Sequence, residues 1–283
     1  MNQMNDAPAL PVFTATRYVQ PLREGGSLPA VLDSDGGLFV TKFRGAGQGA
    51  RALIAEIITG LLGRAAGLPV PELALIDILP VFGRAEPDPE IQDILRASHG
   101  VNVGLRYLDG AFNYDGLAAG ELVDPAFAAD LVWFDAFVTN PDRTARNPNL
   151  MIWARRLWLI DHGAALYAHH DWASIDAART ASPFPLIRDH VLLTHAGDLH
   201  EADSRLAARL TPDIISLVLQ AVPDGLLMDP VIAGEFDNAT AARERYRSYL
   251  TARLANRHTF VQQAVQAQHT ARENPGMRRS ARR

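Results

Sequence analysis

The sequence predicts an α+β protein with two lobes, a small β-rich lobe that contains one helix and a larger, mostly helical lobe. Runs rich in β-branched and aromatic residues, joined by glycine-rich turns, occupy much of the first 108 residues, whereas apolar residues at helical spacing dominate the remainder. The chain has 283 residues, 48% of them hydrophobic, which is enough for a sizeable core. We therefore expect domains at residues 1–108 and 109–268, followed by a disordered basic tail at 269–283.

The first part of the expected small lobe is a set of strands. Residues 14–21, 29–32 and 38–43 are strand-like, and the last of these, Leu-Phe-Val-Thr-Lys-Phe, is rich in β-branched and aromatic side chains. The sequence Asp-Ser-Asp-Gly-Gly at residues 33–37 is typical of a hairpin turn, because Asp-Gly and Gly-Gly tolerate positive φ.

A helix is expected next, at residues 49–66. Leucine and isoleucine recur there at helical spacing, and Gly67 and Pro69 end the pattern. Two more strands are expected at residues 71–79 and 101–108. The small lobe is thus predicted to hold five strands and one helix.

The larger lobe is expected to be helical with one hairpin inserted. Residues 125–138 carry aromatic and aliphatic side chains along one helical face, and Asn140-Pro141 ends the pattern. The remaining expected elements are two short strands at 150–153 and 157–160 and two helices at 212–222 and 239–266.

The composition excludes several classes of protein. The absence of cysteine excludes a disulfide scaffold, a thiol nucleophile and a Cys-ligated metal centre. No apolar run approaches the roughly 18 residues of a membrane helix, and residues 1–11 lack the basic and apolar regions of a signal peptide. We therefore expect a cytoplasmic protein that does not enter a membrane.

The charge pattern gives little sign of a nucleic-acid partner. A net charge of −5 provides no general attraction for nucleic acid. The basic tail is the exception, since it holds five arginines against one acidic residue, Glu273. A solvated tail without a role is the favoured interpretation, and an arm that contacts RNA or a partner is the alternative.

Lys42 is the only lysine among 27 cationic residues, so arginine stands at every other such position. A lysine between apolar neighbours near the end of a strand is costly unless its ammonium is paired or bound to an anion. Glu56, in the following helix, is the predicted partner, and such a pair can aim an ammonium at phosphates. A lysine retained by chance and an ordinary exposed glutamate are the alternatives.

Residues 140–149 form a polar segment between a predicted helix and a predicted strand. Such loops are where catalytic residues concentrate. Asp142 can orient a hydroxyl and accept its proton, and Asn147, five residues later, offers a neutral oxygen to Mg²⁺. The alternative is a polar turn with an Asx cap.

Asp161 follows the apolar strand predicted at 157–160 and precedes His162-Gly163. A carboxylate at the end of a strand, followed by a flexible glycine, suits Mg²⁺, which prefers oxygen ligands. An aspartate that caps the next turn is the alternative.

These features occur in a fixed order: a lysine in a strand, a glutamate in the next helix, D-x-x-x-x-N in a loop, and D-x-G after a hairpin. The order and the spacing from Asp142 to Asn147 match the signature set of protein kinases. The chain resembles the HipA-like kinases, a bacterial branch of the protein-kinase-like fold, over residues 16–72 and 130–172. The resemblance is carried by RYVQPLREGGSLPAVL, GLFVTKFRGAGQGARALIAEIITGLLGRAAGLPVPE, FDAFVTNPDRTARNPNLMIW and LWLIDHGAALYAHH.

This resemblance implies a bilobal protein-kinase-like fold and an enzyme that uses ATP and Mg²⁺ to phosphorylate a hydroxyl. Lys42 would hold the α- and β-phosphates and Glu56 would orient Lys42. Asp142 would be the catalytic base, and Asn147 and Asp161 would hold Mg²⁺.

Two further segments would contact the nucleotide. A glycine-rich loop would cover the phosphates, and a connector would present its backbone to the adenine. Their residues are Arg23, Gly25, Gly26 and Ser27 in the loop and Tyr107, Leu108 and Asp109 in the connector. Because better-known members autophosphorylate a serine of this loop, Ser27 is a hypothetical autophosphorylation site.

The chain departs from the kinase pattern at several points. Asn140 and Pro141 stand where many kinases have His and Arg, the metal motif at 161–163 is Asp-His-Gly, and no segment resembles an A-P-E-type activation loop. Regulation by phosphorylation of an activation loop is therefore not expected.

The resemblance favours a Ser or Thr of a protein as acceptor and allows an antitoxin-type partner, since some members are toxins that act on aminoacyl-tRNA synthetases. A small-molecule kinase of the aminoglycoside-phosphotransferase type and a catalytically inactive nucleotide-binding or interaction module are the alternatives. A metal hydrolase is the weakest reading, because the histidine spacings do not fit shared ligation. Its residues would be Asp161, His162, His169 and His170, and a structural role is favoured for His190, His195 and His200.

Overall fold

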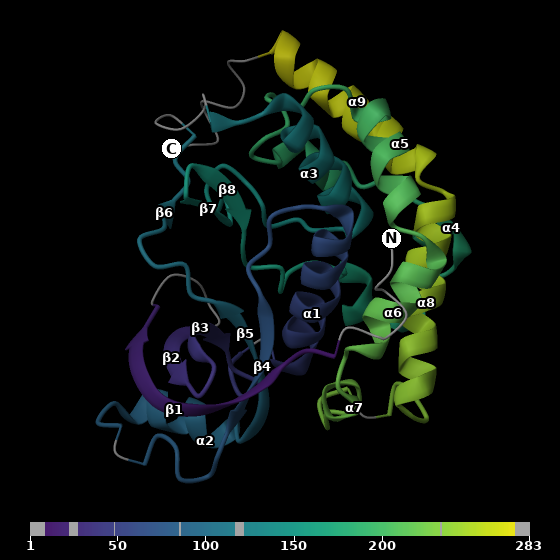
Figure 1. The fold of residues 1–283 in the computed structure, drawn as a ribbon. Coiled ribbons are helices and arrows are strands. Elements are labelled where there is room, and N and C mark those ends of the chain that lie inside the picture. The colour runs from purple at the N-terminus through teal and green to yellow at the C-terminus, as the bar shows by residue number, and fades with distance from the viewer. Residues whose placement is uncertain are drawn as a thin grey trace, which may run out of the picture. The chain divides into compact units, whose positions relative to one another are not determined.

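The structure is a computed structural model that describes residues 9–22, 28–47, 49–84, 86–116, 122–232 and 234–274. It is a mixed α/β structure with two compact units, whose elements are labelled in Figure 1. The first unit contains the described residues of Met1–Leu61, Pro71–Asp109 and Leu217–Glu244, and the second contains those of Leu62–Val70, Gly110–Ser216 and Arg245–Arg283. The expected division at residue 108 stays a prediction; in these units, 62–70 group with the second and 217–244 with the first.

The first unit is built on a closed five-stranded barrel. Its strands follow the order β1-β2-β3-β5-β4, with β1 parallel to β4 and all other neighbours antiparallel. The five strands predicted from the sequence are therefore present, with bounds that shift by a few residues. They are β1 (Val12–Pro21), β2 (Ala30–Ser34), β3 (Gly37–Lys42), β4 (Leu73–Ile78) and β5 (Gly100–Arg106).

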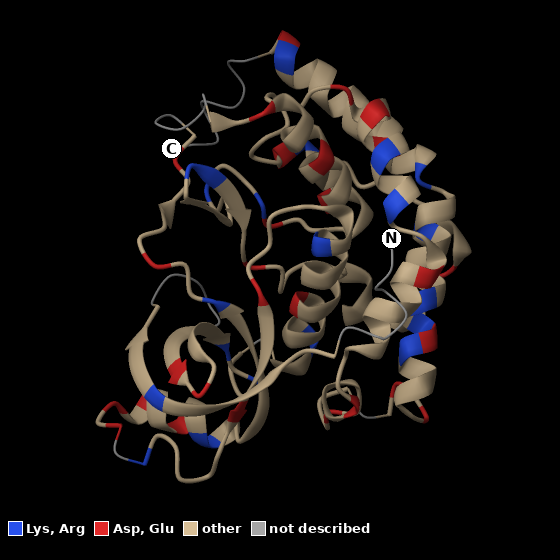
Figure 2. Ribbon diagram, in the orientation of Figure 1, with Lys and Arg blue, Asp and Glu red and all other residues tan. Residues whose placement is uncertain are grey.

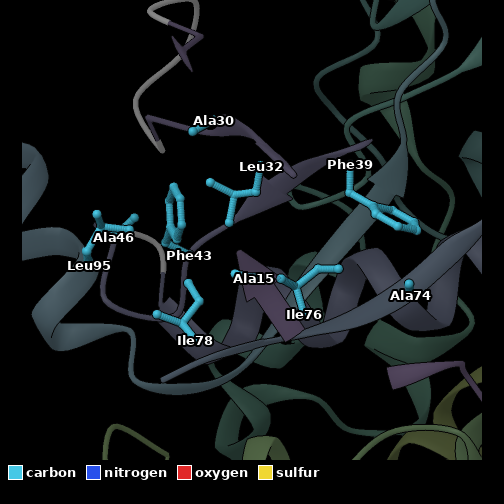
Figure 3. Close-up of a cluster of buried hydrophobic side chains, with 10 residues drawn as sticks. All are labelled: Ala15, Ala30, Leu32, Phe39, Phe43, Ala46, Ala74, Ile76, Ile78 and Leu95. Atoms are coloured by element: carbon cyan, nitrogen blue, oxygen red, sulfur yellow. The ribbon is translucent and has the colours of Figure 1, made fainter. Parts of the chain in front are cut away.

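Alternating side chains of these strands fill the barrel with a hydrophobic cluster (Figure 3). Its buried members are Ala15, Ala30, Leu32, Phe39, Phe43, Ala46, Ala74, Ile76, Ile78 and Leu95. Leu95 comes from helix α2 (Pro89–Ala97), which the sequence prediction omitted when it allowed the small lobe a single helix. The local sequence explains α2, because the Asp88 side chain caps its N-terminus and Pro89 occupies the first turn.

Helix α1 (Gly49–Ala66) has the bounds predicted from its apolar periodicity. A Cβ on Gly60 would lie 2.9 Å from Cδ2 of Leu73 in β4, so the missing side chain lets this turn of α1 lie close to the barrel. The position of α1 matters because Glu56 lies on it.

The second unit is mostly helical and contains a three-stranded sheet in the order β6-β7-β8. The predicted hairpin is present and gains β6 as a third strand. The strands are β6 (Phe112–Asn113), β7 (Leu150–Trp153) and β8 (Arg156–Leu159). The helices of this unit are α3 (Pro125–Phe137), α4 (Ala177–Thr180), α5 (Leu199–Arg209) and α9 (His258–Glu273), with short 3₁₀ helices η2 (Tyr167–His170), η3 (Trp172–Ser174) and η4 (Pro185–Asp189).

Helix α7 (Asp224–Leu227) belongs to the first unit, and two further helices contribute to both units. They are α6 (Pro212–Gln220) and α8 (Ala239–Ala255). Both signs of charge occur along α5 and α8 (Figure 2), as expected for helices with one solvated face.

Helix α3 is the core of the second unit. Asp124 caps its N-terminus, and its other end carries Trp133 and Phe137, whose ring centroids lie 5.5 Å apart. Phe260 of α9 packs edge-on against Trp133 at 5.5 Å. This aromatic cluster fixes the end of α3, from which the polar segment 140–149 departs.

Two predictions about the C-terminal region were wrong. The single helix expected at 239–266 is interrupted after Ala255, where both the N–H and the side-chain amide of Asn256 donate to the carbonyl of Ala252. The disordered tail was expected from residue 269, but α9 continues to Glu273, because Gln268 is buried and both Gln268 and Arg272 donate to the carbonyl of Ala196. Residues 275–283 lie outside the described part of the chain.

A search of the described residues for a helix both long and apolar enough to cross a membrane found none.

The tight packing of the barrel gives a stability prediction at Gly104 in β5. A Cβ there would lie 2.8 Å from Cγ1 of Ile76 and 3.0 Å from Cβ of Phe39. Gly104→Val is expected to lower the free energy of unfolding by about 1–3 kcal/mol through overpacking. Urea denaturation measures this, with Gly225→Ala as the control, since a Cβ on Gly225 meets nothing within 4 Å. Equal stability of the two variants would contradict the packing described here.

Candidate functional site

One group of predicted site residues lies in the first unit, where Lys42 and Glu56 form a buried ion pair. Lys42 is the last residue of β3 and is paired with Val103 of β5. Its Nζ donates to Oε1 of Glu56 on α1. Lys42 is 6% exposed and Glu56 is fully buried. The pairing predicted from the sequence is confirmed, and the role of both residues in catalysis stays a prediction.

The two segments expected to contact the nucleotide differ in what the structure says of them. Arg23, Gly25, Gly26 and Ser27 lie outside the described residues. In the connector, the backbone N–H of Tyr107 donates to the carbonyl of Leu38 at 3.0 Å, so in this conformation it is used within the barrel. The contact of Tyr107, Leu108 and Asp109 with adenine stays a prediction.

Asp142 and Asn147 come together in the second unit, at the end of α3. The side-chain Nδ2 of Asn147 donates to Oδ2 of Asp142 at 2.7 Å. A second amide, Nδ2 of Asn149, donates to the same oxygen at 3.1 Å. The backbone N–H of Asp142 donates to Oδ1 of Asn140 at 3.1 Å. The carboxylate is thus held in one orientation by residues of its own loop.

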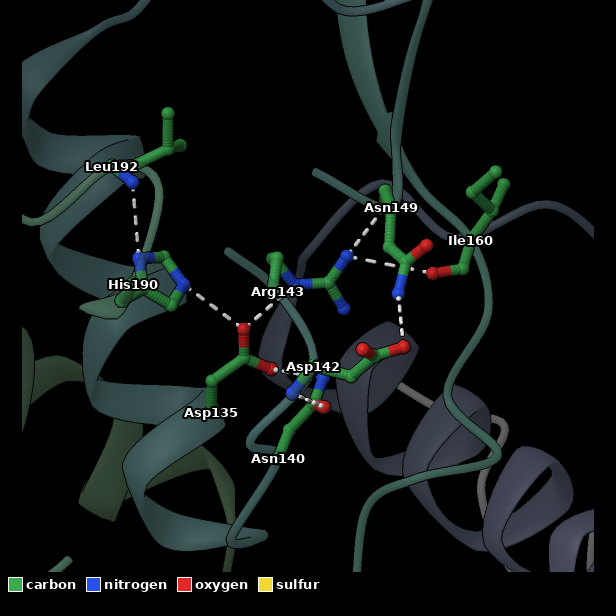
Figure 4. A network of polar contacts seen from close by, with 8 residues as sticks. All are labelled: Asp135, Asn140, Asp142, Arg143, Asn149, Ile160, His190 and Leu192. Atoms are coloured by element: carbon green, nitrogen blue, oxygen red, sulfur yellow. Dashed lines mark hydrogen bonds and ion pairs between the residues drawn. The ribbon is translucent and has the colours of Figure 1, made fainter. Parts of the chain in front are cut away.

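Beneath this loop lies a buried polar network around Asp135 of α3 (Figure 4). Nε of Arg143 donates to Oδ2 of Asp135 at 2.6 Å, and both side chains are fully buried. The amide of Asn140 donates to Oδ1 of Asp135 at 3.2 Å. Nη1 of Arg143 donates in turn to the carbonyls of Asn149 and, at 3.4 Å, Ile160. One guanidinium therefore connects α3 to both strand ends that flank the site.

His190 completes the network from another part of the unit. The backbone N–H of Leu192 donates to Nδ1 of His190 at 3.1 Å, which makes Nδ1 the acceptor nitrogen. Nε2 then carries the proton and lies 3.0 Å from Oδ2 of Asp135. His190 is buried and acts as a structural hydrogen-bond donor, in line with the role favoured for it from the sequence.

The network also changes the titration of Asp135. Complete burial alone would raise its pKa, but the positive charge of Arg143 and the hydrogen bond from His190 outweigh burial and lower the pKa from 3.8 to about 2. Asp135 is therefore an anion at every pH at which the protein is expected to work.

The end of α3 is fixed by a second buried arginine. Arg253 of α8 donates to the carbonyls of Ala136 and Phe137, each at 2.9 Å. The last turn of α3 carries no basic residue of its own. Arg253 therefore supplies the positive charge that the C-terminal end of the helix dipole favours.

Asp161 stands two residues beyond β8 and has a φ of 54°. Few residues other than glycine adopt this left-handed conformation, and aspartate is among those that tolerate it. The residue before it is tied to the Asp142 loop, because the N–H of Ile160 donates to the carbonyl of Asn149 at 3.1 Å. Asn149 itself has a φ of 48°, so both sides of this connection have unusual backbone geometry.

The donor atoms of this second group suit a hard cation. Because Nδ2 of Asn147 donates to Asp142, Oδ1 is the atom of this amide left to coordinate a cation. Together with the Asp161 carboxylate this is an all-oxygen set, which Mg²⁺ prefers. Among the described residues, no group of three or more His, Asp or Glu side chains could hold a metal, so Asp161, His162, His169 and His170 form no such group.

Comparison with known families decides the identity of the chain. A family model described as "HipA-like kinase" matches residues 19–178, which is more than half of the sequence. The chain belongs to the HipA-like kinase family. The matched range contains Lys42, Glu56, Asp142, Asn147 and Asp161.

A solved structure of similar fold accompanies the family assignment. The crystal structure of the Helicobacter pylori proinflammatory kinase CtkA has a TM-score of 0.56 and 14% sequence identity, and the match covers 93% of this HipA-like chain and 99% of CtkA. No curated protein matches the sequence.

Several residues of the site were not predicted from the sequence. Asn149 is the second amide on Asp142, and its place in an Asn-Pro-Asn sequence beside the predicted motif was a usable signal. Asp135, Arg143 and His190 had no such signal, since their contacts span up to 55 residues and depend on the tertiary fold.

The network predicts a large effect of Asp135→Asn on stability. The substitution leaves the buried guanidinium of Arg143 without its counter-charge, so the free energy of unfolding should fall by about 3–5 kcal/mol. Asp130→Asn on the same helix is the control. Because Asp130 pairs with the partly exposed Arg205, it should cost about 1 kcal/mol or less. Equal losses in urea denaturation would contradict the role given to Asp135.

The lowered pKa of Asp135 predicts that the stability contributed by the pair of Asp135 with Arg143 depends on pH. Since the pKa of Asp135 is about 2 in the folded protein and 3.8 when it is unperturbed, its contribution is complete above pH 4 and is lost as the pH falls toward 2. That contribution is about 2 kcal/mol. The stability difference between wild type and Asp135→Asn should therefore shrink by about this amount between pH 5 and pH 2. A difference that stays constant over this range would refute the assignment.

Proposed function

We propose that this HipA-like chain is an ATP- and Mg²⁺-dependent kinase that phosphorylates a Ser or Thr hydroxyl of a protein. The observation that carries the proposal is the contact of Asn147 with Asp142 at the five-residue spacing of the kinase catalytic loop. The buried Lys42–Glu56 pair supports the proposal independently. Kinases also carry a lysine in a strand and its glutamate partner in the helix that follows along the chain.

The proposed fold is bilobal and protein-kinase-like. The barrel unit with α1 corresponds to the small nucleotide-binding lobe, and the helical unit corresponds to the larger lobe. The similarity to CtkA, which extends over 93% of this chain, supports the assignment. Each unit contributes one group of functional residues.

In the first unit, Lys42 contacts the α- and β-phosphates of ATP. Its ammonium lies at the end of a strand and is held by Glu56, which is fixed on α1. A buried carboxylate beside the ammonium pairs with it and limits its rotation. The phosphates thus meet a cation that is already oriented, which reduces the reorganisation needed for transfer.

In the second unit, Asp142 positions the acceptor hydroxyl and accepts its proton. As the acceptor oxygen bonds to the γ-phosphorus, the bond from that phosphorus to the β,γ-bridging oxygen breaks and ADP leaves. The proton of the hydroxyl passes to the Asp142 carboxylate and then to solvent. The amides of Asn147 and Asn149 hold Oδ2 of Asp142 in place, so the hydroxyl meets a carboxylate of fixed orientation.

Asn147 and Asp161 are the residues that would hold Mg²⁺, through the amide oxygen and the carboxylate. The cation supplies neutralisation of the charge on the phosphates. Arg143 donates to the carbonyls of Asn149 and Ile160. These hydrogen bonds hold the segment that carries Asn147 and the segment that carries Asp161 in place relative to each other.

The substrate class and setting follow from the family rather than from the site. A protein acceptor, an antitoxin-type partner and a cytoplasmic location are the expectations that membership of the HipA-like family supports. CtkA, the similar solved structure, is described as a proinflammatory kinase, and that description concerns CtkA.

The decisive variant is Asp142→Ala. Wild-type protein incubated with Mg²⁺ and ATP is expected to form ADP or to gain phosphate, and the rate should fall by at least about 100-fold in Asp142→Ala, because the base and the anchor of both amides are removed. ADP release and intact mass are the measurements. Asp213→Asn on α6 is the matched control and should retain wild-type rates.

Three outcomes separate the alternatives. Loss of turnover in Asp142→Ala alone supports phosphotransfer. Mg²⁺-dependent ATP binding without turnover in either protein, also after protein and small-molecule acceptors are added, favours the inactive nucleotide-binding module. No ATP binding by folded protein contradicts the proposed function.

A further inference from the structure

A segment from the C-terminal part of the chain belongs to the barrel unit. Residues 217–244 run from the end of α6 through α7 to the beginning of α8 and group with the barrel and α1. We call them the strap. Nothing in the family signature concerns the strap, which follows the matched range 19–178.

The base of the strap is closed by Arg243. Its guanidinium donates to the carbonyl of Leu219 at 3.0 Å and to the carbonyl of Val222 at 2.5 Å, and it pairs with Asp224 at 2.5 Å. These contacts join the beginning of α8 to the end of α6. The two ends of the strap are therefore held together by the contacts of Arg243.

The first contact of the strap, made by Asp229, is with the segment that follows β3. Its Oδ2 accepts from Nε of Arg44 at 2.5 Å, and its Oδ1 accepts from the N–H of Val231 at 3.0 Å. Asp229 is only 4% exposed, so its charge needs this partner. Arg44 follows Lys42 by two residues, and its backbone N–H is held by the buried Asn102 of β5 at 2.8 Å. Arg44 thus connects the barrel to the strap immediately after the lysine.

The second contact is with the beginning of α1. Glu235 of the strap pairs with Arg51, which lies in the first turn of the helix. That turn has no acidic residue, and a positive charge at this end opposes the helix dipole. Glu235 therefore supplies the negative charge that the N-terminus of α1 lacks.

We propose that the strap is a positioning element for the nucleotide-binding pair, in which Asp229 and Glu235 hold Arg44 and Arg51 and so fix the end of β3 and the start of α1. Lys42 lies on β3 and Glu56 lies on α1. The strap holds the segment that connects these two elements. The catalytic consequence rests on the proposed function, whereas the mechanical consequence for α1 does not. Asp229, Glu235, Arg44 and Arg51 are proposed as positioning residues, which act through β3 and α1.

The test compares Asp229→Asn/Glu235→Gln with wild type and with Asp237→Asn. Asp237 lies in the same strap and is exposed, so its variant makes the same kind of charge change at a solvated position. The first readout is backbone hydrogen exchange of the full chain without ligand. Exchange of the amides in residues 49–58 and at the end of β3 should be at least about 10-fold faster in the double variant, and unchanged in Asp237→Asn.

A reversed pair provides the rescue. Glu235→Arg alone should accelerate exchange in α1, because it places a second positive charge at the N-terminus of the helix. Glu235→Arg combined with Arg51→Glu should restore slow exchange, because the ion pair re-forms with opposite sense. A merely structural loss at either position would not be restored by the second substitution.

The second readout is the binding of a fluorescent ATP analogue. The double variant should bind it about 5-fold to 10-fold more weakly than wild type, and the reversed pair should bind within about 2-fold of wild type. Unchanged exchange in α1 of the double variant would overturn the proposed role of the strap. Failure of the reversed pair to restore slow exchange would also overturn it. Failure of wild type to bind the analogue would overturn the proposed function instead, and the exchange data would still decide the role of the strap.

Discussion

The carboxylate of Asp135 is the constraint on which the geometry of the second unit depends. It lies at the end of α3, without exposure to solvent, and it holds Arg143, His190 and the amide of Asn140. Through Arg143 it also fixes the carbonyls of Asn149 and Ile160. The loop that carries Asp142 and the segment that leads to Asp161 are therefore fixed relative to the same helix. Removing one partner of a buried charge of this kind is costly, because the charge that remains is left without compensation.

In the first unit a buried cation is likewise held by a partner of opposite charge. A lysine at the end of a barrel strand is paired with Glu56, and the close approach of α1 to the barrel is allowed by Gly60. In the first unit the residue expected to act on the phosphates is held by a partner that lies deeper in the protein, and in the second unit Asp142 is held by the amides of Asn147 and Asn149 from its own loop. Preorganisation of this kind is the main contribution that a protein makes to phosphoryl transfer, in which positioning and charge neutralisation dominate.

Local sequence patterns were sufficient for a large part of the fold. The helix at 49–66, the five barrel strands and the hairpin after the Asp142 loop follow from periodicity and turn residues, which act over a few positions. The ion pair of Lys42 with Glu56 was also predictable, because a sole lysine in an apolar strand has few partners within reach. The choice of Asn147 as a candidate site residue followed from its spacing to Asp142.

What could not be predicted depends on contacts between distant parts of the chain. Asp135 and His190 are 55 residues apart, and Arg44 and Asp229 are 185 apart, so neither pair leaves a local pattern. The missed helix α2 is a different case, since Asp88 and Pro89 form an ordinary local helix start that the sequence analysis did not use. The C-terminal helix was underestimated because its last turn is stabilised by bonds to a distant carbonyl.

The most direct test of the account is the Mg²⁺ dependence of binding of a non-hydrolysable ATP analogue, measured by titration calorimetry on wild type and Asp161→Asn. If the HipA-like chain uses Lys42 and Glu56 for the phosphates and Asp161 for the cation, wild type binds the analogue more tightly with Mg²⁺ than without it. Asp161→Asn should retain the Mg²⁺-free affinity and lose most of the enhancement. Absence of binding by folded wild type, or an equal Mg²⁺ enhancement in both proteins, would contradict the account.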